Sequence, residues 1–280
     1  MKFSFAVWPK SRLSLKDVSY ASSVGFVTAE VSLEYPWPYW EMPKFEELLG
    51  ILKGQGLKLG AHLPWRDFAL ASPYEDVRRG AISYMRRLLD ILRKWEFQYA
   101  VSHFSTKEKV RFNNRDYLQM ATSDLKLLIK EYRDSNVEFA VENSPYGPLS
   151  QKENFLTLAK DLESKVCLDY GHIIAKIMGE GEAQLSILEE ILSDWTNTFA
   201  GMIEVIHMHG VAKINGQVVE HMRISGYEKA FSRSLMTLEK LGKNPHVTLE
   251  VFFKDELFRD AEVEDVAKEL ELLRQARELT

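Results

Sequence analysis

The 280-residue sequence contains one cysteine, Cys167, which excludes a disulfide within the chain. A chain so poor in cysteine fits a reducing compartment. No apolar run reaches the roughly 18 residues that a membrane-spanning helix needs. The apolar start, residues 3–8, is shorter than the core of a signal peptide and is followed directly by Pro9. We therefore expect a cytoplasmic protein with no membrane partner.

The sequence also lacks an excess of positive charge and any visible division into segments. It has 36 Lys and Arg against 41 Asp and Glu, and this net charge of −5 gives no global attraction to nucleic acid. A local basic groove would not show in this sum. No sequence repeat is visible, and no linker rich in Pro, Gly and Ser interrupts the chain. We therefore expect a single domain over residues 1–280.

What the sequence does contain is a regular alternation of two patterns. Short runs rich in Val, Ile, Leu and Phe are apolar on both faces, which is typical of strands buried beneath helices. Between them, residues 75–94 and 114–133 have apolar residues at helical spacing, and similar stretches start near Leu15, Lys44, Gln151, Ala183, Gly226 and Ala261. The predicted strands are residues 2–8, 26–33, 57–62, 97–103, 137–142, 165–169, 203–208 and 246–252. Eight such units predict an α/β fold, a closed (β/α)8 TIM barrel.

A TIM barrel carries its active site at the C-terminal ends of its strands, where the loops into the helices begin. Histidines and carboxylates stand at or just after these ends in the predicted strands: His62, His103, Glu142, Asp169, His172, His207, His209 and Glu250. One histidine at a strand end is more often structural, but all these ends converge on one ring. Crowded carboxylates repel one another unless a cation lies among them. Imidazole and carboxylate ligands together favour zinc, manganese, iron or cobalt over calcium or magnesium, so the sequence predicts a metal site at the barrel mouth.

Several local strings resemble motifs of the xylose isomerase-like TIM-barrel superfamily. His62-Leu-Pro-Trp65 with Leu70-Ala-Ser-Pro73, Val141-Glu-Asn143 and Val166-Cys-Leu-Asp-Tyr-Gly-His172 are similar to motifs of endonuclease IV. His207-Met-His-Gly210 resembles the His-Leu-His-Asp string of sugar phosphate isomerases and epimerases. The strings follow one another in the superfamily's order and extend over the whole predicted barrel.

The resemblance implies a cluster of one to three divalent ions per chain, with zinc or manganese as the expected metals. His62 and His103 would hold one ion, and Glu142 would bridge it to a second ion held by Asp169, His207 and Glu250. His172 and His221 would belong to a third ion. The sequence departs from the family there, since Val219 stands where the family has an aspartate.

The first function that the resemblance implies is isomerisation or epimerisation of a sugar or sugar phosphate. A metal ion on four ligands polarises a carbonyl and its adjacent hydroxyl in such enzymes. Glu142 and Glu250 would move protons as general base and acid. His172 would hold a substrate oxygen, and Lys213 would contact the substrate.

The alternative is phosphoester hydrolysis of the endonuclease IV kind, acting on abasic DNA or another phosphoester. His62 and His103 favour this alternative, because an epimerase with one metal ion does not need them. Val219 and the absence of an obvious DNA-binding stripe oppose it. A third reading is a barrel that binds a ligand without catalysis, and the near-complete ligand set argues against it.

Aromatic residues gather near the ends of the first three predicted strands. Trp8, Trp37, Trp40 and Trp65 are expected to form a wall that stacks on a sugar ring or a base, with Arg66 beside it as a phosphate contact. Glu30 is a candidate for a group that contacts a metal ligand without binding the metal itself. Cys167 shares the strand parity of Asp169, so it is expected to face the barrel interior as core packing. His246 starts the last predicted strand, far from the mouth, and is expected to be structural.

Overall fold

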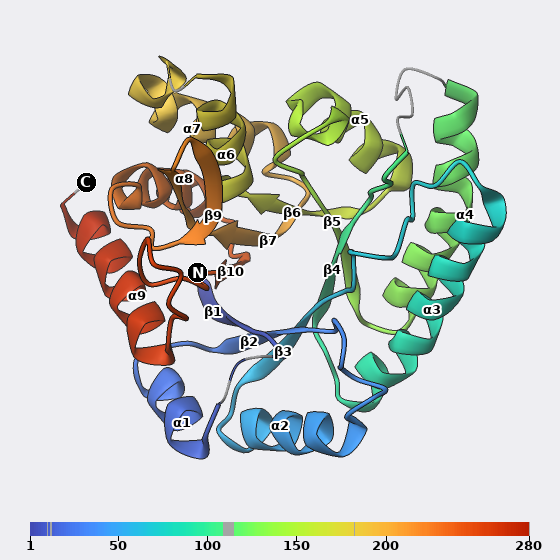
Figure 1. Ribbon diagram of the computed structural model, residues 1–280, viewed down its shortest axis with the longest axis horizontal. Coiled ribbons are helices and arrows are strands. Elements are labelled where there is room, and N and C mark those ends of the chain that lie inside the picture. Colours follow the sequence, from blue (N-terminus) through green and yellow to red (C-terminus); the bar gives the residue numbers. More distant parts are fainter. Residues whose placement is uncertain (10, 12, 109–114, 182, 280) are drawn as a thin grey trace.

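The structure is a computed structural model that describes residues 1–280 apart from residues 10, 12, 109–114, 182 and 280. Its core is a closed barrel of parallel strands in the order β1-β10-β7-β6-β5-β4-β3-β2 (Figure 1). The barrel strands are β1 (Lys2–Val7), β2 (Thr28–Ser32), β3 (Lys58–His62), β4 (Tyr99–His103), β5 (Glu138–Glu142), β6 (Lys165–Asp169), β7 (Ile203–Met208) and β10 (His246–Leu249). The predicted (β/α)8 TIM barrel is confirmed, and every predicted strand is present.

Helices surround the barrel on its outside (Figure 1). They are α1 (Leu15–Ser23), α2 (Met42–Gly54), α3 (Glu75–Lys94), α4 (Arg115–Asp134), α5 (Lys152–Leu162), α6 (Tyr170–Glu180), α7 (Leu188–Phe199), α8 (Glu228–Lys240) and α9 (Val263–Glu278), with short 3-10 turns η1 (Pro148–Ser150) and η2 (Ala183–Ile187). Local sequence explains where they begin. At α1, for example, the Ser14 hydroxyl accepts the backbone N–H of Asp17, and the Asp17 carboxylate accepts that of Ser14.

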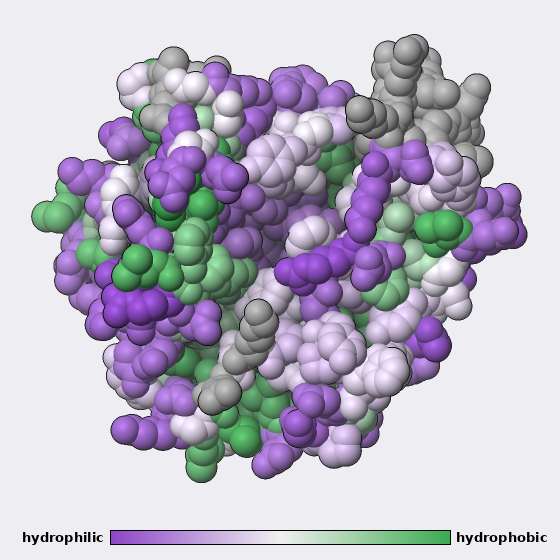
Figure 2. Space-filling view, in the orientation of Figure 1, coloured by the Kyte–Doolittle hydropathy of each residue, from purple (hydrophilic) through white to green (hydrophobic). Residues whose placement is uncertain are grey.

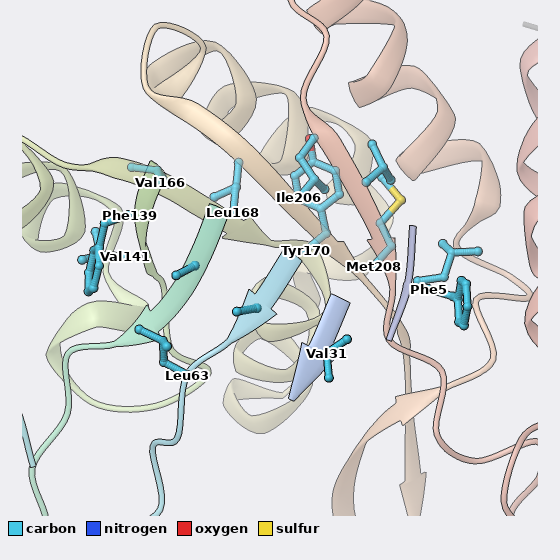
Figure 3. Close-up of a cluster of buried hydrophobic side chains, with 14 of the residues drawn as sticks. Phe5, Val31, Leu63, Phe139, Val141, Val166, Leu168, Tyr170, Ile206 and Met208 are labelled. Carbon is cyan, nitrogen blue, oxygen red and sulfur yellow. The ribbon is translucent and has the colours of Figure 1, made fainter. Parts of the chain in front are cut away.

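Alternation along the strands separates an apolar outer face, packed against the helices, from a barrel interior in which polar and small apolar side chains are mixed. Figure 3 shows Val166 and Leu168 of β6 and Ile206 and Met208 of β7 within the buried apolar cluster between the strands and the helices. The residues between them have the opposite parity and face inward, since successive side chains of a strand point to opposite sides. Cys167 belongs to this inner set and lies in a small buried cluster with Tyr99. The expected inward direction of Cys167 is confirmed.

Two elements after β6 were not predicted. Helix α6 follows β6 without a loop, because Asp169 ends the strand and its carboxylate also accepts the backbone N–H of His172 as the helix cap. A hairpin of β8 (Gly210–Ile214) and β9 (Gln217–Met222) replaces the predicted loop after β7. Its two-residue turn is Asn215-Gly216, both with positive φ, a strong hairpin signal that the sequence reading passed over. Among the described residues, every helix is too short or too polar to span a bilayer.

Candidate metal centre

Four side chains from neighbouring barrel strands converge at the C-terminal mouth of the barrel. Around Nδ1 of His207 lie Glu142 Oε1 at 3.1 Å, Glu250 Oε1 at 3.5 Å and Asp169 Oδ2 at 3.9 Å. These residues come from β7, β5, the segment after β10, and β6, and each is at most 3% exposed. Figure 2 shows a hydrophilic hollow near the middle of the face in view, beside the hairpin of β8 and β9. The resemblance assigned these four residues to one ion, and the structure brings them together.

A second group adjoins the first on the side of β3 and β4. Oε2 of Glu142 lies 3.0 Å from Nε2 of His103 and 3.4 Å from Nε2 of His62. Glu142 therefore presents one oxygen to His207 and the other to the two remaining histidines. The bridging role that the resemblance implies for Glu142 stays a prediction.

The donor atoms fit a divalent cation. Within the described part of the chain, Oε2 of Glu142 and Oδ2 of Asp169 are buried and have no hydrogen-bond partner. Buried carboxylate oxygens of this kind are costly unless a cation or a donor compensates them. Imidazole nitrogens and carboxylate oxygens that could share an ion lie within 4.8 Å of one another in several overlapping groups, including His62, His103 and Glu142. The chemistry of this set suits zinc, manganese, iron or cobalt.

The pKa values of the two glutamates, Glu142 and Glu250, are shifted in opposite directions. Burial raises the pKa of Glu250 to about 7, although the charge of His207 opposes the shift. Burial also acts to raise the pKa of Glu142, but the charges of His103 and His207 outweigh it and hold that pKa well below its usual range. Two carboxyl groups in one pocket thus prefer different protonation states, a pattern found where a base and an acid work side by side.

The histidines assigned to a third ion are not brought together as expected. His172 shares a possible ion group with Asp169 and His209, whereas His221 shares one with His209 and Glu250. The left-handed backbone of His221, at φ 59°, breaks the strand alternation, so Glu220 and His221 both face the mouth. Oε1 of Glu220 lies 3.6 Å from Nε2 of His172. His209 was predicted at the barrel mouth, but the resemblance assigned no ion to His209 or Glu220, although the shared parity of His207 and His209 was a usable signal.

The side chain of Glu30 lies inside the barrel and contacts the imidazole ring of His207. Its Oε1 is 2.9 Å from Nε2 of His207, and its Oε2 accepts hydrogen bonds from the hydroxyls of Tyr99 and Thr248, each at 2.8 Å. Because a carboxylate faces Nε2, that nitrogen keeps its proton, and Nδ1 is the atom turned towards Glu142, Asp169 and Glu250. The sequence reading named Glu30 only as a group behind the ligands, and this is where it lies.

We expect Glu30→Gln to weaken binding of the ion at His207 by roughly 10- to 100-fold, because a neutral amide orients and polarises the imidazole less well. Titration of metal-depleted protein with Mn²⁺ or Zn²⁺ measures the affinity. Glu47→Gln, on the exposed face of α2, is the matched control and should leave it unchanged. Equal affinities in the two variants would contradict a positioning role for Glu30.

Part of the predicted aromatic wall stands at the mouth. The ring of Trp65 lies 5.4 Å from that of His103, and the ring of Trp8 lies 6.4 Å from that of His62. The guanidinium of Arg66 lies over both tryptophans, 4.8 Å from Trp65 and 5.7 Å from Trp8, and also 3.6 Å from a carboxylate oxygen of Glu34.

The positions predicted for two of the four tryptophans, Trp37 and Trp40, were wrong. Trp37 is buried against Phe45 of α2, and Trp40 is 80% exposed beside Tyr35. Both follow β2 in a loop that turns outward over α2, which the strand pattern alone does not reveal.

Two further predicted residues, Lys213 and His246, lie away from the cluster around His207. Lys213 is exposed on β8, so its role in substrate binding stays a prediction. His246 lies at the start of β10, buried against the ring of Tyr99, with Thr28 Oγ1 3.2 Å from its Nδ1. The structural role expected for His246 is consistent with this position.

Solved structures with the same architecture include several sugar epimerases. The chain superposes on D-psicose 3-epimerase from Clostridium cellulolyticum H10 with a TM-score of 0.71 and 16% identity, covering 99% of each chain. It superposes on 3-keto-D-glucoside 4-epimerase from E. coli with a TM-score of 0.72 and 13% identity, covering 98% of this chain and 99% of that one. For L-ribulose 3-epimerase the values are 0.69 and 16%, with 99% and 96% covered. At these identities the likeness shows the fold.

Sequence comparison identifies the family. No curated protein has a sequence that matches this chain. A family model described as xylose isomerase-like TIM barrel, in contrast, matches residues 18–276, nearly the whole barrel. That match agrees with the strings at the ends of β3, β5, β6 and β7. The chain therefore belongs to the xylose isomerase-like TIM-barrel family.

Proposed function

We propose that this chain is a divalent-metal-dependent enzyme that isomerises or epimerises a sugar or sugar phosphate by proton transfer next to a carbonyl. The observation that carries the proposal is the convergence of Glu142, Asp169 and Glu250 on Nδ1 of His207 in one buried pocket. The solved epimerases with the same fold make a keto-sugar substrate the natural one to test.

Each residue of the pocket has a part in this chemistry. Glu142, Asp169, His207 and Glu250 would hold the ion, which when bound polarises a substrate carbonyl and its neighbouring hydroxyl. Glu142 and Glu250 reach the pocket from β5 and from the end of β10, which are separated in the barrel by β6 and β7. They therefore approach a substrate from different sides. One carboxylate takes the proton from the carbon beside the carbonyl, and the other carboxyl group returns one to it.

Other residues would bind and orient the sugar. Trp8 and Trp65 offer flat apolar surfaces above His62 and His103, suited to the apolar face of a sugar ring. His172 donates from Nδ1 to the carbonyl of Asn143 at 2.8 Å, which leaves Nε2 directed towards the mouth. Arg66 and Lys213 are the candidate contacts for a phosphate, if the substrate carries one.

The test is an assay of the full-length chain with a panel of ketoses and ketose phosphates in D2O. With Mn²⁺ or Zn²⁺ present, we expect a new epimer or isomer with deuterium on the carbon that inverts or gains hydrogen. Chelator treatment should abolish the product, and metal replacement should restore it. Deuterium-free products, or no turnover on any member of the panel by metal-loaded protein, would contradict the proposal.

Phosphoester hydrolysis is the second candidate, and the contacts of His62 and His103 with Glu142 favour it. The same preparation should therefore be incubated with DNA that contains an abasic site. If metal-loaded protein cuts this DNA, and His62→Ala abolishes the cut, the hydrolase replaces the isomerase as the proposed function.

A further inference from the structure

A side chain completes the connection between β5 and β6 at the mouth of the barrel. The last residues of the two strands in register are Glu142 and Cys167. Beyond them, the side-chain amide of Asn143 bonds the backbone of Asp169 twice. Its Oδ1 accepts the N–H at 2.7 Å, and its Nδ2 donates to the carbonyl at 3.0 Å. At three other strand pairs a backbone N–H makes the bond beyond the ladder, from Leu33 to His62, from Leu63 to Val101 and from Glu250 to Met208.

The amide of Asn143 matches both of its partners. The backbone of Asp169 offers an N–H, which donates, and a carbonyl, which accepts, and an asparagine side chain carries the complementary acceptor and donor. Asn143 is 1% exposed and Asp169 is 0% exposed, so both bonds are shielded from water. Such bonds are costly to lose, because the buried N–H and carbonyl are then left without partners.

Through these bonds Asn143 connects two of the candidate metal ligands. It directly follows Glu142 in the chain, and the backbone that it binds belongs to Asp169 on the neighbouring strand. The carboxylate of Asp169 is oriented as well, since its Oδ1 accepts the N–H of His172 at 2.8 Å. Within the described residues its Oδ2 has no hydrogen-bond partner, and this oxygen lies 3.9 Å from Nδ1 of His207.

The backbone carbonyl of Asn143 orients a third group at the mouth. It accepts from Nδ1 of His172, which is the residue that we expect to hold a substrate oxygen. Asn143 thus makes three hydrogen bonds to the junction of β6 and α6, where the strand passes into the helix without a loop. A displacement of Asn143 would therefore move Asp169 and His172 together.

We propose that Asn143 is a positioning residue for the ion at His207. Its amide sets the separation of Glu142 and Asp169, and its carbonyl sets the direction of the His172 ring. Both polar groups of its side chain are bound to Asp169, so Asn143 is not itself a ligand. The part that concerns His172 and the substrate rests on the proposed function, whereas the part that concerns the ion is tested without a sugar.

The first test compares Asn143→Ala with Asn154→Ala in the full-length chain. Asn154 is an exposed residue of α5 whose Nδ2 also donates to a backbone carbonyl, that of Pro148 at 3.1 Å, so it is the matched control. Metal-depleted protein is titrated with Mn²⁺. We expect Asn143→Ala to bind the ion roughly 10-fold more weakly or worse, because Asp169 is no longer held in place. Asn154→Ala should bind it as the unaltered protein does.

The melting temperature of each metal-depleted protein separates positioning from a purely structural role. A lower melting temperature of Asn143→Ala with unchanged Mn²⁺ affinity would show that the amide only stabilises the fold, and would overturn the proposal. A loss of affinity in Asn154→Ala as large as in Asn143→Ala would overturn it too, because the effect would then not depend on Asp169.

A second variant, Asn143→Ser, guards against a folding defect in Asn143→Ala. The serine hydroxyl can still bond one of the two backbone groups of Asp169, so less is lost in the fold. The visible absorption of bound Co²⁺ reports the geometry of its ligands, and we expect this spectrum to shift in Asn143→Ser. An unchanged spectrum with unchanged Co²⁺ affinity rejects the positioning role.

These readouts keep the inference apart from the proposed function. If Asn143→Ala binds Mn²⁺ as tightly as the unaltered protein, and the unaltered protein epimerises a ketose, only the role of Asn143 fails. If the affinity falls as expected but no ketose is turned over, the role of Asn143 at the ion stands and the proposed function fails.

Discussion

Glu250→Gln is expected to lower the rate of epimerisation roughly 1,000-fold while the barrel stays folded. Glutamine has nearly the shape of glutamate, but its amide can neither take nor give the proton that moves at the substrate carbon. Glu250 is buried at 3% exposure and its Oε1 lies 3.5 Å from Nδ1 of His207, inside the pocket. Deuterium incorporation from D2O measures the loss directly.

The control for this variant is Glu256→Gln, an exposed residue six positions further along the chain, which should retain full activity. Metal content should be measured in parallel, because Glu250 is also a candidate ligand. A variant that keeps its metal and exchanges no deuterium assigns a proton-transfer role to Glu250. Activity within a few-fold of the unaltered protein would remove Glu250 from the mechanism.

Glu142→Gln should behave differently, although it loses the same chemistry. Its two oxygens face His62, His103 and His207, so the neutral amide weakens the hold on metal as well as the proton transfer. The two variants together therefore separate a carboxylate that mainly moves protons from one that also organises the centre.

Gly60→Ala is expected to destabilise the protein by about 3 kcal/mol, because the added methyl group has no room. Gly60 faces the barrel interior on β3, and a Cβ there would lie 2.2 Å from the ring of Tyr99. Tyr99 cannot yield easily, because it is 0% exposed and its hydroxyl is bound to Glu30. The melting temperature should fall by roughly 6–12 °C.

Gly50→Ala is the matched control, because Gly50 lies on the exposed face of α2 and its added Cβ would meet nothing within 4 Å. That change should stabilise the protein by about 0.5–1 kcal/mol, since alanine favours a helix more than glycine does.

Combining Gly60→Ala with Tyr99→Leu should destabilise the protein by less than the sum of the two single changes, because leucine leaves room for the methyl group. Additive costs would show that Gly60 and Tyr99 do not clash.

The structure also explains why some of the site was hidden in the sequence. His62, His103, Glu142 and Asp169 end strands and His207 is one residue from the end of β7, and strand ends are visible in the apolar pattern. Glu220 lies on β9, a strand outside the barrel, where no rule connects position in the chain with the mouth. The left-handed residue His221 then turns two successive side chains the same way, against the alternation that a sequence reading must assume.

Apolar periodicity and strand ends are local properties of the chain, so they were enough to predict the barrel, its strands and the ring of histidines and carboxylates at its mouth. The barrel and the hairpin, in contrast, set which of these donor atoms come within 4.8 Å of one another. The contacts join residues far apart in the chain, such as Glu30 and His207 at 2.9 Å or His172 and Glu220 at 3.6 Å. Barrel closure and the hairpin set those distances, and no spacing along the chain records them.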